Sequence, residues 1–277
     1  MIRSEKGCRN NSRVAAGARA IALAVLSVGG AASAANTDEA FTGRWRIDTA
    51  SITGDIKTTV FRVRGGVFRR DDNTAVRADG QLHRVPSDGY VDEQSISVES
   101  DRVIKEIDKV RGKLAYTVDY VLSPDGNTLT WHVASYTGPD GHAVRSETVQ
   151  RRVGLASKGA HPISGTWKRV GVTVDSRQDT ILKLDGNHFS SRTDSGSGFD
   201  AIIGGDPVRL DGDNSGVRAQ ITRPRPDLIV ETDLSVRGTV DDVLSLQMMP
   251  DQRTIRATGV YGPKKRSTTF YLHKQSE

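Results

Sequence analysis

The sequence predicts an all-β protein built from two similar antiparallel barrels in tandem. The segment 41–46, Phe-Thr-Gly-Arg-Trp-Arg, returns at 163–168 as Ile-Ser-Gly-Thr-Trp-Lys. Three later landmarks return at similar offsets, 121 to 126 residues on: Arg111-Gly112 as Arg237-Gly238, Pro124-Asp125 as Pro250-Asp251, and Arg145-Ser146 as Arg266-Ser267. A repeat of this length is a whole domain, because solenoid units span only about 20–50 residues. Short alternating strands fill both copies, and an up-and-down barrel is expected for each, with a two-sheet sandwich as the alternative.

Residues 1–34 have the pattern of an export signal. Five basic residues precede a short apolar core at 20–28, and Ala32-Ser-Ala34 forms a small-residue cleavage site. The apolar core is far shorter than the ~20 residues that span a bilayer. We therefore expect a cleaved signal peptide and a periplasmic or secreted protein that does not span the membrane. Cys8 precedes the apolar core, so no lipid anchor is expected.

Removal of this leader changes what the charge implies. The whole chain carries a formal charge of +5, but the remainder has 34 basic and 33 acidic residues. The high isoelectric point therefore gives no reason to expect nucleic-acid binding, and the signs alternate along the chain. The remainder also lacks cysteine, which excludes disulfides, thiol nucleophiles and zinc–thiolate sites.

Strand patterns recur through both copies. In the segment 113–122, residues 114, 116, 118, 120 and 122 are all apolar or aromatic and fall on one face, because side chains alternate with period two. The other expected strands are 57–64, 128–133 and 147–153 in the first copy and 180–184, 228–232, 243–248 and 267–272 in the second. Asp-Gly and Gly-Gly pairs between them suit tight hairpin turns. No window after the leader shows a helix-length 3.6-residue apolar period. We place one barrel at 35–153, a linker at 154–162 and the other barrel at 163–277.

These motifs together resemble the lipocalin-like (calycin-type) barrels, and more closely a group of small bacterial exported β-barrel proteins. That group begins with Gly-x-Trp and carries a Ser-x-Asp-Gly-Lys-Thr-Leu-Thr hairpin. The first copy is similar through Gly43-Arg-Trp45 and Ser123-Pro-Asp-Gly-Asn-Thr-Leu-Thr130, and the second through Gly165-Thr-Trp167. The resemblance implies a barrel able to hold a hydrophobic ligand. It also implies that Trp45 and Trp167 close one end of a barrel against a basic residue, which is a structural role.

Four residues of the first copy are the candidate ligand-binding set. Tyr116, Val118 and Tyr120 share a strand face, and Trp131 stands on the next expected strand. Aromatic rings with polar tips suit a mostly apolar ligand, although ordinary core packing explains the same pattern. At the corresponding offset the aromatic residues become Asp242, Leu246 and Ala257, so only the first barrel is expected to have an aromatic lining.

No catalytic residue can be assigned, and the weak candidates are His132, His83 and Tyr136. A histidine pair, or a histidine with a tyrosine, across a barrel would make a plausible acid and base. No histidine spacing favours a metal site, no nucleotide or hydrolase motif is present, and neither a metal nor a cofactor is expected.

Three functions follow from these patterns. The first is an exported small-molecule-binding protein that holds a largely apolar or aromatic metabolite or a lipid in the first barrel. The second is a cofactor-free lyase, isomerase or hydrolase acting at the barrel mouth. The third is a non-catalytic interaction module with a protein partner in the envelope. Nucleic acid is not an expected partner of any of them.

Overall fold

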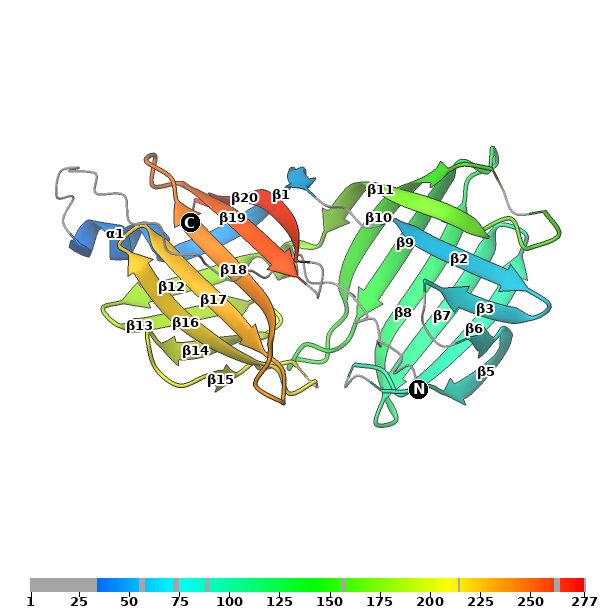
Figure 1. Ribbon diagram of the computed structural model, residues 1–277, viewed down its shortest axis with the longest axis horizontal. Coiled ribbons are helices and arrows are strands. Elements are labelled where there is room, and N and C mark those ends of the chain that lie inside the picture. The colour runs from blue at the N-terminus through cyan, green and yellow to red at the C-terminus, as the bar shows by residue number, and fades with distance from the viewer. Residues whose placement is uncertain are drawn as a thin grey trace. The chain divides into compact units, whose positions relative to one another are not determined.

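The chain folds into two antiparallel sheets of ten strands each, and each sheet curves into a nearly closed barrel (Figure 1). This computed structural model describes residues 34–54, 58–71, 75–87, 90–155, 158–213, 215–261 and 265–276. The all-β, two-barrel prediction is confirmed. The proposed leader, 1–34, lies outside the described residues except for Ala34.

We call the first compact unit, Ile56–Asp175, barrel 1. Its strands are β2 (Thr59–Arg64), β3 (Val67–Arg70), β4 (Val76–Arg77), β5 (Asp79–Arg84), β6 (Glu93–Ser100), β7 (Val103–Val110), β8 (Lys113–Leu122), β9 (Thr128–Ser135), β10 (Val144–Val153) and β11 (Gly165–Val174). The order round the sheet is β4-β3-β2-β11-β10-β9-β8-β7-β6-β5.

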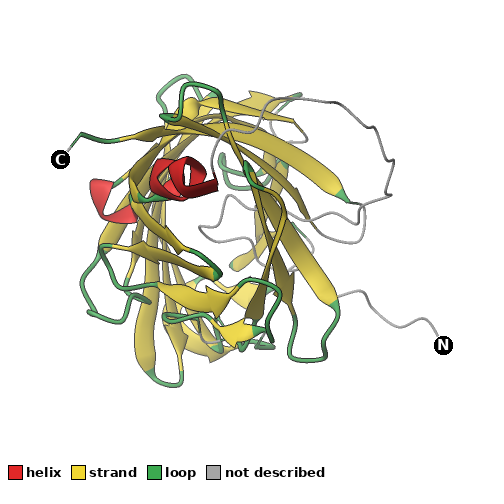
Figure 2. Ribbon diagram, turned by 90° about the vertical axis from the view of Figure 1, so that its left-hand side faces the viewer, coloured by secondary structure: helices red, strands yellow, loops and turns green. Residues whose placement is uncertain are grey.

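We call the second unit barrel 2; its described part comprises residues 34–54 and the chain from Ser176 onward. It contains α1 (Ala34–Phe41), β1 (Gly43–Gly54), η1 (Ser176–Gln178), β12 (Thr180–Asp185), β13 (His188–Thr193), β14 (Gly198–Ile202), β15 (Val208–Arg209), β16 (Arg218–Arg225), β17 (Leu228–Leu234), β18 (Val240–Met248), β19 (Thr254–Tyr261) and β20 (Arg266–Lys274). Seen along this barrel, the strands run round a ring with α1 at one end (Figure 2). The eight-residue helix α1 was not predicted, because it is too short to show an apolar period.

The first strand of each sequence repeat belongs to the other repeat's barrel. Strand β1 lies between β12 and β20, and β11 lies between β2 and β10. In Figure 1 the blue β1 accordingly runs among the orange and red strands. The sequence repeats 35–153 and 163–277 therefore differ from the compact units by one strand each. Barrel 1 is one continuous stretch of chain, inserted between β1 and the rest of barrel 2.

The two exchanged strands are held in matching registers. Gly165 and Trp167 pair with Phe61 and Thr59 in barrel 1. In barrel 2, Gly43 and Trp45 pair with Leu182 and Thr180. The repeated Gly-x-Trp motif therefore occupies the same position in both barrels, and sequence comparison of the repeats alone cannot say which strand joins which barrel.

Two ion pairs on the outer face distinguish β1 from β11. Arg44 makes two hydrogen bonds to the carboxylate of Asp194, at 2.5 and 2.9 Å. Arg46 does the same with Asp179, at 2.9 and 2.7 Å. Strand β11 carries Thr166 and Lys168 at the equivalent positions, and Thr58 of barrel 1 stands where Asp179 stands in barrel 2. These pairs favour β1 in barrel 2, because both of its arginines meet a carboxylate there.

Both tryptophans are fully buried and packed against a cation, as the resemblance implied. The Arg152 guanidinium lies 4.2 Å from the centre of the Trp167 ring, and Lys274 Nζ lies 5.6 Å from that of Trp45. Each indole N–H donates to the carbonyl four residues earlier, Ile163 for Trp167 and Phe41 for Trp45.

The glycine of each motif leaves room for this cation. Gly43 and Gly165 both have φ +142°, a backbone conformation that L side chains rarely adopt. A Cβ added at Gly165 would stand 2.6 Å from Arg152 Nη1, and one added at Gly43 would stand 2.7 Å from Lys274 Cε.

All eight strands expected from the alternating patterns are present, with ends that differ by a few residues. Most of the others lack an unbroken alternation. The apolar–polar alternation is too brief in short strands such as β3 and β4, and too weak in polar strands such as β6 and β13. Among the described residues, no helix is long and apolar enough to cross a membrane.

The strand exchange predicts which fragment of the chain folds alone. Residues 56–175 contain all ten strands of barrel 1, so we expect this fragment to unfold cooperatively. Residues 35–153 lack β11 and carry β1 without Asp179 and Asp194. We expect that fragment to be less stable by about 2 kcal/mol, which lowers its midpoint by roughly 10 °C. Circular dichroism melts of both fragments measure this, and equal midpoints would contradict the observed division of strands.

Candidate functional site

The predicted ligand-binding residues lie together on the inner face of barrel 1. Tyr116, Val118 and Tyr120 are buried on β8. Trp131 on β9 stands directly opposite Tyr120, and their ring centroids are 5.3 Å apart at an interplanar angle of 82°. Residues paired across neighbouring strands share a face of the sheet. The set is therefore contiguous, as its alternation predicted.

Two phenylalanines from the first strands of barrel 1 complete an aromatic cluster. The ring centroid of Phe61 on β2 lies 5.2 Å from that of Tyr120 and 5.6 Å from that of Trp131, and both contacts are edge-on. Phe68 on β3 lies 5.7 Å from Phe61. These are the edge-to-face contacts that aromatic rings favour. Strands β2, β3, β8 and β9 thus meet through their rings inside the barrel.

An ion pair is buried against this cluster, which the apolar pattern did not predict. Arg70 on β3 lies 3.3 Å from both carboxylate oxygens of Glu106 on β7. Its guanidinium is 5.7 Å from the Trp131 ring centre and also donates to the Tyr120 hydroxyl. Tyr120 in turn donates to Glu106. Arg70 is 7% exposed and Glu106 1%, so the pair is shielded from water.

A second carboxylate extends the network along β7. The side-chain amide of Gln94 on β6 donates to Glu106 Oε1 at 2.5 Å and to Asp108 Oδ1 at 2.8 Å. Gln94 and Asp108 are both buried. The barrel therefore encloses one guanidinium and two carboxyl groups joined by amide and phenol hydrogen bonds.

These neighbours fix the protonation of the arginine and the phenol. Burial by itself lowers the pKa of Arg70, but Glu106, Tyr120 and Asp108 together raise it above its ordinary value. Burial raises the pKa of Tyr120 well above its ordinary value, and the nearby carboxylates add to this against the opposing effect of Arg70. Arg70 is thus a permanent cation and Tyr120 a neutral hydrogen-bond donor.

Part of this network recurs in barrel 2, which is the signal that sequence reasoning missed. The pattern Ile104-x-Glu106-x-Asp108 returns 125 residues later as Ile229-x-Glu231-x-Asp233. Glu106 stands opposite Val118 and Glu231 opposite Leu244, so the register also matches. Both barrels therefore carry this glutamate and aspartate at equivalent positions.

The partners of the acidic pair do not recur. At the place of Arg70, barrel 2 has Ser191, which pairs with Leu182 as Arg70 pairs with Phe61. At the places of Tyr120 and Trp131 it has Leu246 and Ala257. The arginine, the phenol and the indole are therefore specific to barrel 1.

On strands β9 and β10, two buried side-chain atoms have no hydrogen-bond partner among the described residues. They are the indole nitrogen Nε1 of Trp131 and the side-chain oxygen Oε1 of Gln150. Gln150 lies on β10 opposite Leu129, which is two residues from Trp131 on β9, and its side chain is 3% exposed. A donor and an acceptor thus stand unsatisfied on neighbouring strands, where each costs about 1–3 kcal/mol.

The three catalytic candidates are not brought together. His132 faces outward on β9 with its Nδ1 3.3 Å from Glu147. His83 on β5 lies 2.8 Å from Asp79, and three strands separate β5 from β9. Tyr136 follows the end of β9. Period-two alternation from Trp131 already places His132 on the outer face.

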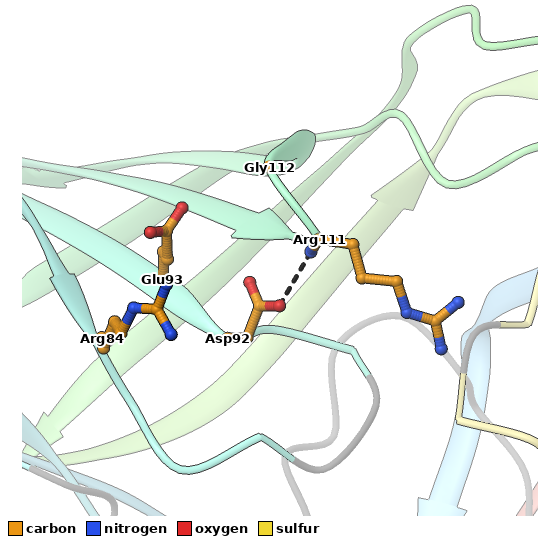
Figure 3. A pocket seen from close by; sticks show the side chains of 5 residues that line it. All are labelled: Arg84, Asp92, Glu93, Arg111 and Gly112. Atoms are coloured by element: carbon orange, nitrogen blue, oxygen red, sulfur yellow. Dashed lines mark hydrogen bonds between the residues drawn. The ribbon is translucent and has the colours of Figure 1, made fainter.

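A pocket of about 270 Å³ opens elsewhere on barrel 1, lined by Arg84, Asp92, Glu93, Arg111 and Gly112 (Figure 3). The Arg111 backbone N–H donates to Asp92 at 2.8 Å, and the Arg111 side chain points away from Arg84 and Glu93. The pocket shares no residue with the inner cluster. Within the described part of the chain, no three His, Cys, Asp or Glu side chains are grouped to hold a metal ion.

No protein-family model matches this chain, and no curated protein matches it.

The buried ion pair predicts an asymmetric response of the two barrels to the same mutation. Glu106→Gln leaves the Arg70 charge buried without its main partner, so we expect the free energy of unfolding to fall by about 3 kcal/mol. The matched control is Glu231→Gln, because barrel 2 has Ser191 at the position of Arg70, and it should lower the free energy of unfolding by less. Urea unfolding of both variants tests this, and equal losses would show that Arg70 does not depend on Glu106.

The raised pKa of Tyr120 predicts a loss of stability at high pH. The pKa in the folded protein lies above the unfolded value of about 10, so above that pH the unfolded chain binds fewer protons than the folded one. We expect the free energy of unfolding to fall by up to about 1.4 kcal/mol per pH unit between pH 10 and the folded pKa. Urea titrations at several pH values measure the slope, and Tyr120→Phe should reduce it. An unchanged slope would contradict the assignment to Tyr120.

Proposed function

We propose that this is an exported small-molecule-binding protein that holds a largely apolar, planar ligand inside barrel 1. The binding surface would consist of Tyr116, Val118, Tyr120 and Trp131. The proposal places the protein among the lipocalin-like barrels. Its support there is the Gly-x-Trp motif at the start of β1 and β11, with a cation on each indole ring.

The observation that carries the proposal is the unsatisfied pair of Trp131 Nε1 and Gln150 Oε1. Buried polar groups in native proteins almost always have a hydrogen-bond partner. A ligand that presents an acceptor to the indole N–H and a donor to the amide oxygen would satisfy both atoms.

The aromatic cluster supports a flat ligand body. Rings of Phe61, Tyr120 and Trp131 line one region of the interior and meet edge-on, which gives this region an aromatic wall. Arg70 is engaged with Glu106, Tyr120 and the Trp131 ring. The network therefore holds the rings in place and makes the wall rigid, which favours tight binding.

The size of the barrel and the contrast between the repeats also favour this reading. A closed barrel of about eight strands has room for its own side chains or one small ligand, and each sheet here has ten. Barrel 2 has Leu246 and Ala257 in place of the ring pair, and its inner face is aliphatic at those positions. The ligand is accordingly assigned to barrel 1 alone.

Ligand binding can be tested with protein taken from its native compartment. Native mass spectrometry should show a co-purifying molecule, and adding that molecule to the stripped protein should change the fluorescence of Trp131. The change should be absent in Trp131→Phe.

Gln150→Leu separates binding from folding. We expect it to weaken ligand binding about 10-fold, because one hydrogen bond is lost, while leaving the free protein as stable as before or more stable. Gln220→Leu on β16 of barrel 2 is the control and should leave affinity unchanged. Absence of any bound mass, together with a Trp131 signal that ignores every metabolite pool, would overturn the proposal.

A further inference from the structure

The outer face of strands β2 to β4 carries four arginines that form no ion pair with any carboxylate in the described part of the chain, and we infer that this face docks barrel 1 onto an anionic lipid bilayer. We call the exposed residues Arg62, Arg64, Arg69 and Arg77 the arginine face. It is distinct from the inner cluster, and the inference does not depend on the proposed ligand.

The arginine face contains an unfavourable arrangement of like charges. Arg62 on β2 stands directly opposite Arg69 on β3. Val67 stands opposite both Arg64 on one side and Arg77 on the other, and is 38% exposed. Like charges directly opposite in a sheet are destabilising. Because this arrangement lowers the stability of the fold, we attribute it to a role in binding.

The acidic side chains described near the arginine face already hydrogen-bond other groups. None of the four guanidinium groups forms an ion pair with a described carboxylate, and Arg62 donates at 3.0 Å to the backbone oxygen of Asp71. The Asp71 carboxylate accepts from the backbone N–H of Val60 at 2.9 Å. Asp79 lies near Arg77, but its carboxylate holds His83. The positive charge of the face is therefore exposed to solvent.

Barrel 2 provides an internal comparison, because its exposed arginines in the same region are paired. Arg192 on β13 contacts Asp200 at 2.9 Å and Asp211 at 2.8 Å. Arg44 and Arg46 on β1 contact Asp194 and Asp179. At the positions of Arg62 and Arg69, barrel 2 has Lys183 and Ser190, so its cross-strand pair brings no two cations together. The repeats share a fold, and barrel 1 alone leaves this face charged.

The composition of the face favours lipid phosphate over other polyanions. Guanidinium groups bind phosphate in a bidentate manner, and Val67 offers an aliphatic contact among them. The outward residues of these three strands include no aromatic ring, whereas proteins that bind single strands of nucleic acid stack bases on such rings. Anionic leaflets attract clustered basic residues within about a Debye length.

Vesicle sedimentation tests the docking with the full chain. The probe is vesicles of equal parts phosphatidylglycerol and phosphatidylcholine, against vesicles of phosphatidylcholine alone. We expect binding only to the anionic vesicles and a steep loss with added salt. Replacing all four arginines of the face with glutamine should weaken binding about 30-fold or more, since each basic residue near the surface contributes several-fold.

The control carries the same change of charge on barrel 2. Lys183→Gln, Arg237→Gln, Arg253→Gln and Arg256→Gln together remove four exposed cations without touching the arginine face, and should change binding less than about 3-fold. Equal losses in the two variants would reduce the effect to net charge and overturn the inference.

Arg69→Glu distinguishes docking from a fold effect. It creates an opposite-charge pair with Arg62, so we expect the melting temperature to rise while vesicle binding falls. Vesicle binding that is unchanged in this variant overturns the inference. So does a wild-type protein that ignores anionic vesicles but binds single-stranded DNA or an acidic protein through the same four arginines.

Discussion

Each barrel depends on one cation held between a tryptophan ring and backbone carbonyls. In barrel 1, Arg152 lies on Trp167 and donates to the carbonyls of Gly126, Ser164 and Pro162. It thereby joins a hairpin turn to the segment that leads into β11. In barrel 2, Lys274 lies on Trp45 and donates at 3.0 Å to the carbonyls of Glu39 and Ala40 in the last turn of α1.

This contact explains why the motif needs all its parts together. The last strand of each sequence repeat (β10 or β20) supplies the cation, the exchanged strand supplies the ring, and the glycine lets the cation approach. In barrel 2 the cation also lies where the helix dipole is negative. Around this shared closure the repeats have diverged. Barrel 1 has the buried arginine, the tyrosine and the third tryptophan inside and a charged outer face, whereas barrel 2 has Leu246 and Ala257 at the places of those two rings and paired arginines on its surface.

Much of the fold could be predicted from the sequence because the information was local. Alternation over 113–122 places Tyr116, Val118 and Tyr120 on one face whatever the rest of the chain does. The assignment of β1 and β11 to barrels could not be predicted, because their Gly-x-Trp motifs are equivalent. What distinguishes them is a pair of distant aspartates, Asp179 and Asp194, that meet Arg44 and Arg46 only after folding.

The candidate site was predicted in part. Its rings followed from alternation, whereas Arg70 was not singled out; it follows the exposed Arg69 and points inward because of its place in β3. Glu106 and Asp108 were detectable, since they recur as Glu231 and Asp233. The arginine face was hidden because charges that alternate in sign along the chain can still gather in space, when a hairpin places Arg62 against Arg69.

The exchange of first strands also sets an order of assembly. During synthesis, barrel 1 has every strand it needs once β11 has emerged, while β1 has long been made and its partners β12 and β20 have not. Trp45 and both edges of β1 remain unpaired until β12 and, last of all, β20 have been made. Such an interval exposes apolar surface and unpaired backbone groups. The insertion of one barrel into the other thus makes the earliest-made strand among the last to find its place.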